Sequence, residues 1–194
     1  MKVIVAEALG MCFGVRDALA DLKKVDHPGE ATIHGELVHN ERVLSDLEQR
    51  GFRMIAEEKR TGVPETPVVV ITAHGISNAE RSRFELAGKQ MVDTTCPLVR
   101  NVHEAAQRLQ DDGFHVLVIG RANHVEVRGI VGDLKDFHII ETKTDVATYA
   151  HPRLGVICQS TTPEHFAEEI LGIIREKNPG KEVVDKSITQ SSDS

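Results

Sequence analysis

The sequence predicts an α/β fold made of two similar three-layer lobes with mostly parallel sheets. Short runs of β-branched residues alternate along the chain with segments of helical periodicity, and this alternation is typical of parallel sheets covered by helices. Chemically reactive residues also recur at strand ends with a nearly constant separation of about 85 residues, which indicates an internal repeat. We therefore expect two lobes with the same architecture.

The expected strands are short and rich in Val and Ile. The clearest is the run PVVVITA, whose continuous apolar character is typical of a strand buried on both faces of a parallel sheet. The predicted strands are residues 2–6, 31–35, 67–73, 89–95, 114–120, 137–141, 154–159 and 181–185. The last of them, KEVVD, imitates the segment before Cys96, and we interpret it as the first strand of a third repeat.

Helices are expected between these strands, and several carry capping signals. Ser77 and Glu80 form the pattern of a capping box, Pro97 stands in a first helical turn, and Gly51 follows a helix end. The predicted helices are residues 14–25, 40–51, 77–88, 97–113 and 162–180. The charge run AEEKR at 56–60 has the composition of a solvated surface.

The repeat is defined first by two pairs of residues at strand ends. Cys12 follows one predicted strand and precedes a helix, and Cys96 does the same 84 residues later. His74 ends another strand, and Ser160 occupies the equivalent place 86 residues further on. Each half of the chain therefore presents one cysteine and one polar side chain from corresponding positions.

A third pair has the pattern His-x-Glu. His39 and Glu41 follow a strand in the first half, and His124 and Glu126 follow one 85 residues later. In open α/β sheets, ligands bind outside the carboxyl ends of the strands. Two lobes that face each other would therefore bring these groups into one cleft.

The repeat also predicts the domain boundaries. We expect a first lobe over residues 1–95, which carries Cys12, and a second lobe over residues 96–184, which carries Cys96. Residues 185–194 are expected to be a polar tail and the vestige of a third repeat.

Composition and charge exclude several classes of protein. The net charge of −7 argues against non-specific nucleic-acid binding, and a chain with no Trp and one Tyr lacks the residues of a base-stacking platform. No apolar run approaches the roughly 18 to 20 residues that span a bilayer, and an acid interrupts the short apolar N-terminus. We expect a cytoplasmic protein that binds neither nucleic acid nor membrane, whose three cysteines serve metal binding, catalysis or burial.

Six segments resemble, in order, the signatures of the 4-hydroxy-3-methylbut-2-enyl diphosphate reductase (LytB, IspH) family. They are GMCFGVRDAL, HGELVHN, TAHGIS, DTTCPLV, GRANHVEVRG and CQSTT, and the resemblance runs through residues 1–189. It implies three α/β lobes around an iron–sulfur cluster, with one cysteine from each lobe, and reductive removal of a hydroxyl from an allylic diphosphate in isoprenoid biosynthesis. We expect this chain to be a short form that lacks the third lobe and the third cluster cysteine.

The resemblance also implies roles for individual residues. Glu126 matches the acid that delivers protons, His124 matches a histidine at the substrate cavity, and Ser160 falls near the leaving hydroxyl; these are the expected catalytic residues. The residues that the resemblance places at the substrate are His39, His74, Gln159 and Thr161. From its position alone, Glu126 could equally be a helix N-terminal acid stabilised by the helix dipole.

The metal ligands are expected among the cysteines. Cys12 and Cys96 each stand at a helix start, where the helix dipole favours the thiolate form that binds iron. Their positions alone allow buried thiols, nucleophiles or ligands, and the resemblance implies that both are ligands of a cluster, expected to be [4Fe-4S]. Cys158 matches Thr72 in the repeat and so resembles a small buried strand residue, but it is kept as a candidate third ligand.

Two cysteines are too few for a four-iron cluster, since four thiolates, or three with one open iron, are the familiar arrangements. A homodimer would supply four thiolates around a twofold axis, and it is the assembly we expect. The leading function is a cluster-dependent reductase that acts on a small anionic or allylic diphosphate-like substrate, with ferredoxin or flavodoxin as electron donor. The alternatives are a non-catalytic dimeric iron–sulfur protein for electron transfer or redox sensing, and an inactive fragment of a full-length reductase.

Overall fold

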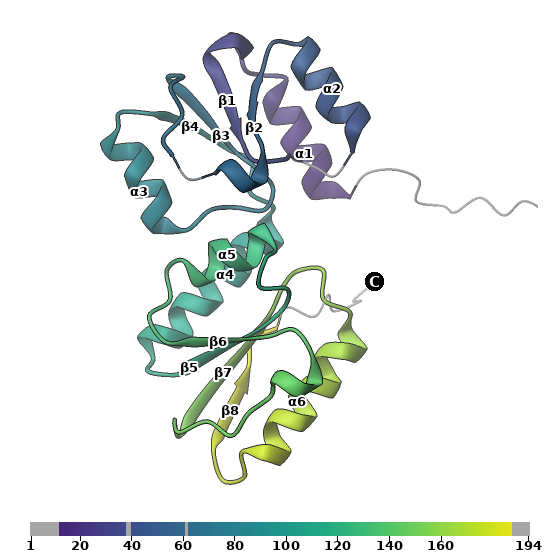
Figure 1. Ribbon diagram of the computed structural model, residues 1–194, viewed down its shortest axis with the longest axis vertical. Helices are drawn as coiled ribbons and strands as arrows, with labels where there is room; N and C mark the ends of the chain where they lie inside the picture. The colour runs from purple at the N-terminus through teal and green to yellow at the C-terminus, as the bar shows by residue number, and fades with distance from the viewer. Residues whose placement is uncertain (1–11, 38–39, 61, 188–194) are drawn as a thin grey trace, which may run out of the picture.

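The molecule consists of two α/β lobes stacked along its long axis (Figure 1). The computed structural model describes residues 12–37, 40–60 and 62–187. Within these residues each lobe contains one four-stranded sheet, and all the strand pairs in both sheets are parallel. The predicted α/β class, with two similar three-layer lobes and parallel sheets, is therefore confirmed.

The first sheet has the strand order β2-β1-β3-β4. The elements of the first lobe are α1 (Phe13–Leu22), η1 (Pro28–Glu30), β1 (Ala31–His34), α2 (Glu41–Gln49), β2 (Arg53–Ile55), η2 (Glu57–Lys59), β3 (Val68–Ile71), α3 (Asn78–Leu86) and β4 (Gln90–Asp93). Helices α1 and α2 pack on one face of this sheet, and α3 packs on the other. The predicted strand at 2–6 lies outside the described residues.

The second sheet repeats this plan with the order β6-β5-β7-β8. The elements of the second lobe are α4 (Pro97–Asp111), β5 (His115–Ile119), α5 (Val125–Val131), β6 (Phe137–Ile140), η3 (Lys143–Asp145), β7 (Arg153–Cys158), α6 (Glu164–Lys177) and β8 (Glu182–Asp185). Each strand and each α-helix of the second lobe has its counterpart in the first, from α1 and α4 to β4 and β8. The structure thus reproduces the internal repeat.

One expectation about the repeat was wrong. The segment KEVVD does not open a third lobe, because β8 pairs in parallel with β7, from Arg153 opposite Glu182 to Val156 opposite Asp185. It closes the second sheet in the way that β4 closes the first, and its likeness to the segment before Cys96 has this origin. Two elements were also missed, β2 with three residues and α5 with seven, since both are too short for a clear period.

Alternating residues of β5 fill the two cores of the second lobe. Val116 and Val118 face α4 and α5, whereas Leu117 and Ile119 face α6, as expected for successive side chains of a strand. All four are fully buried. The strands are continuously apolar because helices cover both faces of the sheet. Polar side chains that could serve a function are therefore found at the strand ends.

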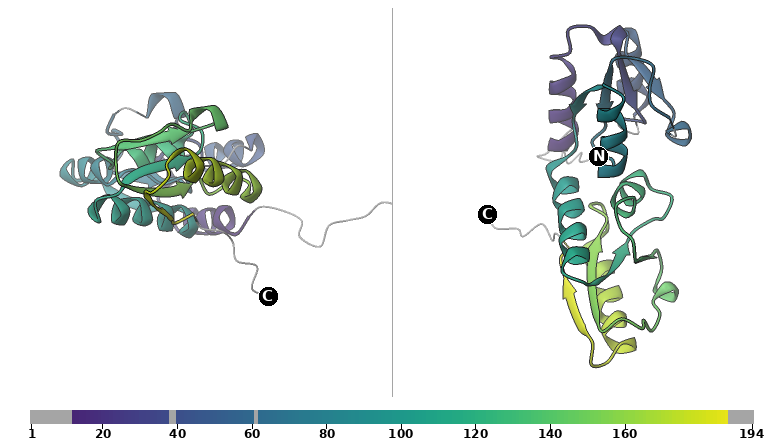
Figure 2. Two further views of the ribbon diagram at one scale, coloured as in Figure 1. Left: turned by 90° about the horizontal axis from the view of Figure 1, so that it is seen from below. Right: turned by 90° about the vertical axis from the view of Figure 1, so that its left-hand side faces the viewer.

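The lobes meet where α4 and α5 contact the loops of the first lobe. The views in Figure 2 place α1 and α4 on the same side of the molecule. The amides of Asn78 and Ala79, at the start of α3, donate to the carboxylate of Asp133 across the junction at 2.7 and 3.1 Å. Within the part of the chain that the structure describes, every helix is too short or too polar to cross a bilayer.

Candidate functional site

Two cysteines begin equivalent helices of the two lobes. Cys12 is the N-cap of α1 and is exposed, and Cys96 is the N-cap of α4 and is half-buried. Neither thiol makes a capping hydrogen bond to its own helix. Both sulfurs therefore stand beside first-turn amides whose dipole favours a thiolate, while remaining available to an external ligand.

A contact at Gly14 shows how closely the two cysteine segments approach each other. A Cβ atom on Gly14 would lie 2.8 Å from the Sγ of Cys96, so only glycine fits at this position without movement of the thiol. Gly14 is two residues beyond Cys12, in the first turn of α1. The cysteine at the start of the second lobe is therefore pressed against the helix that carries the first cysteine.

The backbone before Cys96 is fixed to strand β3 and the loop that follows it. The amide of Cys96 donates to the carbonyl of Ala73 at 3.0 Å, and the amide and hydroxyl of Thr94 both donate to the carbonyl of Ile71, at 3.0 and 2.6 Å. Thr95 donates from its amide and its hydroxyl to the carboxylate of Asp93, at 3.0 and 2.6 Å. Both threonines of DTTCPLV therefore stabilise the turn before Cys96. These bonds hold the thiol of Cys96 at the end of the first sheet.

Glu126 is the most deeply buried acid of the second lobe, with 1% of its surface exposed. Its carboxylate accepts hydrogen bonds from the amide of Ser160 at 2.6 Å and from the Ser160 hydroxyl at 2.8 Å. Burial raises the pKa of Glu126, and the hydrogen bonds from Ser160 oppose this rise without cancelling it. A carboxyl group of this kind can hold a proton closer to neutral pH than an exposed glutamate can, and can then donate it.

Two histidines from different lobes meet next to this acid. His74 follows β3 and His124 caps α5, and their rings lie edge to face with centroids 5.5 Å apart. The Nδ1 atom of His124 accepts a hydrogen bond from the amide of Glu126 at 3.2 Å, which places the proton of the neutral ring on Nε2. The lobe junction therefore brings together imidazole groups that are 50 residues apart in sequence.

The segment after β7 is held by its own side chains. Gln159 is buried, accepts from the amide of Arg121 at 3.2 Å and donates to the hydroxyl of Thr161 at 2.9 Å. Ser160 lies between them, is exposed and turns toward Glu126. The structure thus joins Glu126, His124, Ser160 and the neighbours of Ser160 at one end of the second sheet, whereas His39 lies outside the described residues.

Cys158 has a different environment from the other two cysteines. Its side chain belongs to the core between the sheet and α6, on the opposite face of the sheet from α4, and its sulfur lies 3.0 Å from the hydroxyl of Ser187. Burial raises the pKa of this thiol to about 11, although the contact with Ser187 acts in the other direction. The placement favours a core thiol, and a ligand role for Cys158 stays a prediction.

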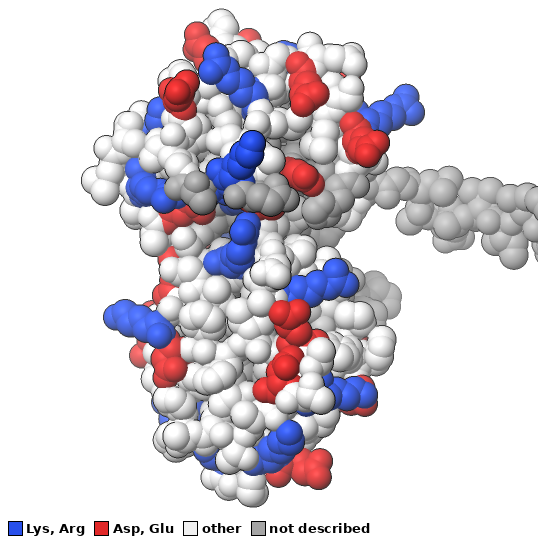
Figure 3. All heavy atoms as spheres, viewed as in Figure 1, with Lys and Arg blue, Asp and Glu red and all other residues white. Residues whose placement is uncertain are grey.

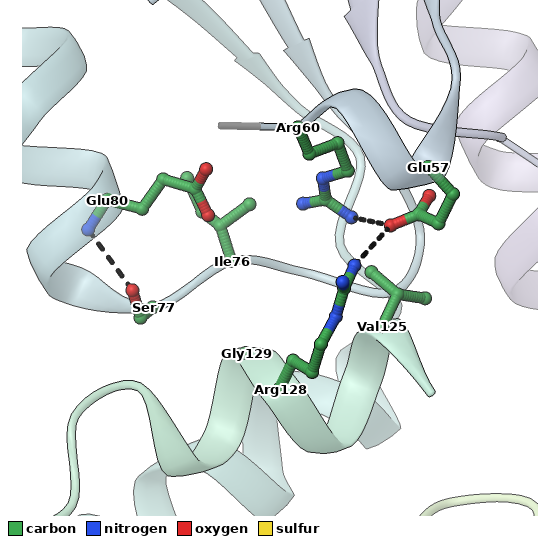
Figure 4. A pocket seen from close by; sticks show the side chains of 8 residues that line it. All are labelled: Glu57, Arg60, Ile76, Ser77, Glu80, Val125, Arg128 and Gly129. Carbon is green, nitrogen blue, oxygen red and sulfur yellow. Dashed lines mark hydrogen bonds and ion pairs between the residues drawn. The ribbon is translucent and has the colours of Figure 1, made fainter. Parts of the chain in front are cut away.

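A pocket of about 190 Å³ lies between the lobes, and α5, which His124 caps, forms one of its walls (Figure 4). It is lined by Glu57, Arg60, Ile76, Ser77, Glu80, Val125, Arg128 and Gly129. The carboxylate of Glu57 pairs with Arg60 of its own lobe at 2.8 Å and with Arg128 of α5 at 3.1 Å. The expectation that the run AEEKR is simply a solvated surface was therefore wrong for Glu57 and Arg60. The charged composition of the run does not indicate that Glu57 pairs with an arginine of the other lobe.

Comparison with known proteins identifies the family. The family model of the LytB protein matches residues 3–192. A 4-hydroxy-3-methylbut-2-enyl diphosphate reductase of Aquifex aeolicus is 33% identical over 182 residues, 90% of this chain and 62% of the relative. The enzyme of the same name from Methylibium petroleiphilum is 35% identical over 183 residues, 91% of this chain and 55% of the relative.

Solved structures agree with this result. The chain resembles a reductase described as the terminal enzyme of the non-mevalonate pathway, with a TM-score of 0.77 and 30% identity, over 95% of this chain and 66% of that one. It also resembles the E-1-hydroxy-2-methyl-but-2-enyl-4-diphosphate reductase of Plasmodium falciparum, with a TM-score of 0.79 and 30% identity, over 90% of this chain and 56% of that one. The chain thus spans less than two thirds of the length of these relatives, and nearly all of its own residues match them. From its sequence, fold and site, this chain belongs to the LytB family.

Proposed function

We propose that this protein holds an iron–sulfur cluster through Cys12 and Cys96 and catalyses the reductive removal of a hydroxyl group from a small anionic substrate of the allylic diphosphate type. The observation that carries the proposal is the buried Glu126 with its raised pKa, bonded to Ser160 beside the histidine pair. The relatives are named as reductases of such a diphosphate, and membership of the family implies the cluster.

The donor set fits a cluster in its chemistry. Cysteine thiolates are the usual ligands of iron–sulfur clusters, and both sulfurs stand at helix N-termini without competing capping bonds. When bound, the cluster, which we propose to be [4Fe-4S], supplies electrons and an iron that can act as a Lewis acid. The scheme does not need Cys158, whose thiol is buried against α6.

The residues of this chain would manage the proton and the substrate. Loss of a hydroxyl as water consumes two electrons and two protons, so a proton donor must stand beside the leaving oxygen. We assign this role to Glu126, with the hydroxyl of Ser160 orienting its carboxyl group and the Nε2–H of His124 as a second donor to the substrate.

Other groups would bind the anionic part of the substrate. The rings of His74 and His124 lie edge to face, and we propose that His74 contacts the diphosphate together with His39, which lies outside the described residues. Gln159 and Thr161 bond to each other, and we assign them to the wall of the substrate site. In this scheme the lobes are residues 1–95 and 96–184, and the site lies between them.

We propose further that the protein acts in the cytoplasm as a homodimer and receives electrons from ferredoxin or flavodoxin. These assignments rest on the family and on the need for more than two thiolates. The pairs Cys12 and Cys96 of two subunits would together supply four ligands.

Anaerobic reconstitution with iron and sulfide, followed by EPR spectroscopy of the reduced protein, tests the proposal. We expect a cluster signal that changes when 4-hydroxy-3-methylbut-2-enyl diphosphate is added. Cys12→Ser and Cys96→Ser should lose the cluster, whereas the matched control Cys158→Ser should keep it.

The outcomes separate the alternatives. A signal that the diphosphate leaves unchanged would contradict the reductase and favour a protein of electron transfer or redox sensing. Cluster loss in Cys158→Ser would instead show that this cysteine is the third ligand.

A further inference from the structure

The second lobe carries another group of metal-binding side chains at the amino ends of its strands, away from Glu126 and the cysteines. His115 begins β5, Asp136 precedes β6, and His151 lies in the loop before β7. One ligand atom from each of these three residues lies within 4.8 Å of the other two. The chain thus brings two imidazoles and one carboxylate to one point from three separate segments.

His115 is the buried member of the group, with none of its side chain exposed. Its Nε2 lies 2.7 Å from Nδ1 of His138 on the neighbouring strand, so one proton is shared between the two rings. Its Nδ1 is only 3.0 Å from Oδ1 of Asp136, yet the pair does not have the alignment of a hydrogen bond, and Nδ1 has no hydrogen-bond partner among the described residues. The buried ring nitrogen and the carboxylate oxygen therefore face each other across a space that is filled either by a proton on Nδ1 or by a metal cation.

This arrangement favours a cation. When Nε2 of His115 donates its proton to His138, Nδ1 carries a lone pair that points to the same space as the lone pairs of Asp136. Two acceptors at this distance repel each other unless a positive charge lies between them. Metal-binding histidines commonly donate their other ring N–H to a neighbour, and His138 stands where such a partner is needed.

His151 completes the group from the solvent side. Its Nε2 is 3.2 Å from Oδ2 of Asp136, and 43% of its side chain is exposed. Its ring is stacked on that of His115, with centroids 4.1 Å apart and planes 4° from parallel. A metal ion in the planes of both rings requires the His151 ring to rotate, and its exposed position in the loop leaves room for this rotation.

We infer that His115, Asp136 and His151 form a binding site for a divalent transition metal of the zinc class, with His138 as the residue that orients His115. Two histidines and one carboxylate, with water in the fourth position, are a ligand set that zinc accepts. Bound metal would tie the loop before β7 to the starts of β5 and β6.

The site is separate from the proposed cluster. Cys96 begins α4 and His115 follows its end, and a helix of 15 residues is about 22 Å long. The inference therefore holds whether or not the chain is a reductase.

Metal titration of the 194-residue chain tests the inference. We expect Zn²⁺ to raise the melting temperature by about 5 to 10 °C at a hundredfold excess over its dissociation constant. Asp136→Asn and His151→Ala should abolish this shift, and both residues are exposed enough for the variants to fold. His138→Ala should weaken binding by about 10- to 100-fold, the usual cost of losing an orienting partner.

The control must distinguish this site from the thiols, which also bind zinc. His165→Ala, on the exposed side of α6, is the matched control and should keep the full shift. Co²⁺ in place of Zn²⁺ reports its ligands: we expect visible ligand-field bands that disappear in His151→Ala, without the ultraviolet charge-transfer band of a thiolate. Metal binding that is unchanged in Asp136→Asn and His151→Ala, or a thiolate band that accounts for all bound Co²⁺, would overturn the inference.

Discussion

Both oxygens of the Glu126 carboxylate accept hydrogen bonds from a single residue, Ser160. The acid is 1% exposed and lies in the first turn of α5, so its environment combines desolvation with the positive end of a helix. Desolvation is the larger effect, and it raises the pKa of Glu126. Glu126 therefore has the properties of a proton donor. The same burial means that the folded protein is less stable when Glu126 is ionised than when it is protonated.

Replacement of Glu126 by glutamine separates catalysis from stability. The glutamine side chain would keep the shape and could still accept from the amide of Ser160, but it has no proton to deliver. We expect Glu126→Gln to lower turnover by about 10²- to 10⁴-fold, the usual contribution of a general acid. Cluster content, measured as iron and sulfide per chain, should stay unchanged.

The pH dependence of stability gives a second readout of the same variant. Because the folded-state pKa of Glu126 lies above its ordinary value of 4.5, the folded protein binds more protons than the unfolded chain in the window between the two values. The free energy of unfolding contributed by Glu126 thus falls as pH rises through this window. Melting curves should show Glu126→Gln gaining stability relative to the parent from below pH 4.5 toward neutral pH, and a constant difference would contradict the raised pKa.

Gly14 is a second position where one residue decides the geometry of the site. Alanine normally stabilises a helix relative to glycine by about 1 kcal/mol, but its methyl group here would collide with the thiol of Cys96. We expect Gly14→Ala to cost about 1–3 kcal/mol of unfolding free energy and to reduce the iron content after reconstitution. Gly29→Ala is the control, since its added Cβ would meet no atom within 4 Å.

At the scale of residues, the sequence was enough to predict which side chains are reactive but not which side chains contact one another. The repeat predicted that Cys12 and Cys96 are equivalent, and the structure shows both as N-caps. The hydrogen bond of Ser160 to Glu126 and the close contact of Gly14 with Cys96 depend on how the lobes and loops pack, and no local sequence pattern predicts this packing. The same holds for the group around His115, whose close approach no spacing in the sequence indicates.

Helix α3 illustrates how elements of one lobe are completed by the other. Ser77 caps the amide of Glu80 within the helix's own lobe, and Asp133 from the second lobe accepts from the amides of Asn78 and Ala79. A carboxylate at this end also interacts favourably with the helix dipole. The start of α3 is therefore a joint between the lobes.

Removal of the Asp133 carboxylate should reduce the free energy of unfolding and the cooperativity with which the two lobes unfold. We expect Asp133→Ala to cost about 0.5–2 kcal/mol, as for the loss of a helix cap, and to broaden or split the unfolding transition in calorimetry. Asn40→Ala is the matched control, because Asn40 caps α2 through the amides of Arg42 and Val43 inside the first lobe. Equal behaviour of the two variants would contradict a coupling role for Asp133.

At the scale of elements, long segments with clear periods were predictable and short ones were not. Helices α4 and α6, with 15 and 14 residues, follow from their apolar spacing and end signals. Helix α5 has seven residues, and its buried side chains pack mainly into the core of the second lobe, so that tertiary packing rather than length stabilises it. The pairing of β8 with β7 was also hidden, because a strand's sequence does not state which sheet it joins.

For the whole molecule, the alternation of strands and helices was enough to predict the fold class, and the near-constant spacing was enough to predict two equal lobes. The packing of one lobe on the other was not predictable, since it depends on particular bridges such as Glu57 with Arg60 and Arg128. On the face in Figure 3, acidic and basic side chains are interspersed, with basic ones at the junction.

The proposed assembly can be tested by mass. We expect the reconstituted protein to have twice the mass of the 21.4 kDa chain and to contain about four irons per dimer, because two subunits supply four thiolates. Cys96→Ser should remain monomeric under the same conditions in light scattering. A monomer with about four irons would contradict shared ligation.

The turn at residues 94–96 has one more consequence. The described chain passes from the first sheet to the second once, between β4 and α4, and Cys96 stands at this crossing. Gly14 of the first lobe contacts Cys96. Asp133 and Arg128 of the second lobe bond to residues of the first lobe elsewhere at the junction. Iron held at Cys96 would therefore tie the segment that joins the two lobes to the start of α1, and an oxidant that removes the iron would release this segment as well as ending the chemistry of the cluster.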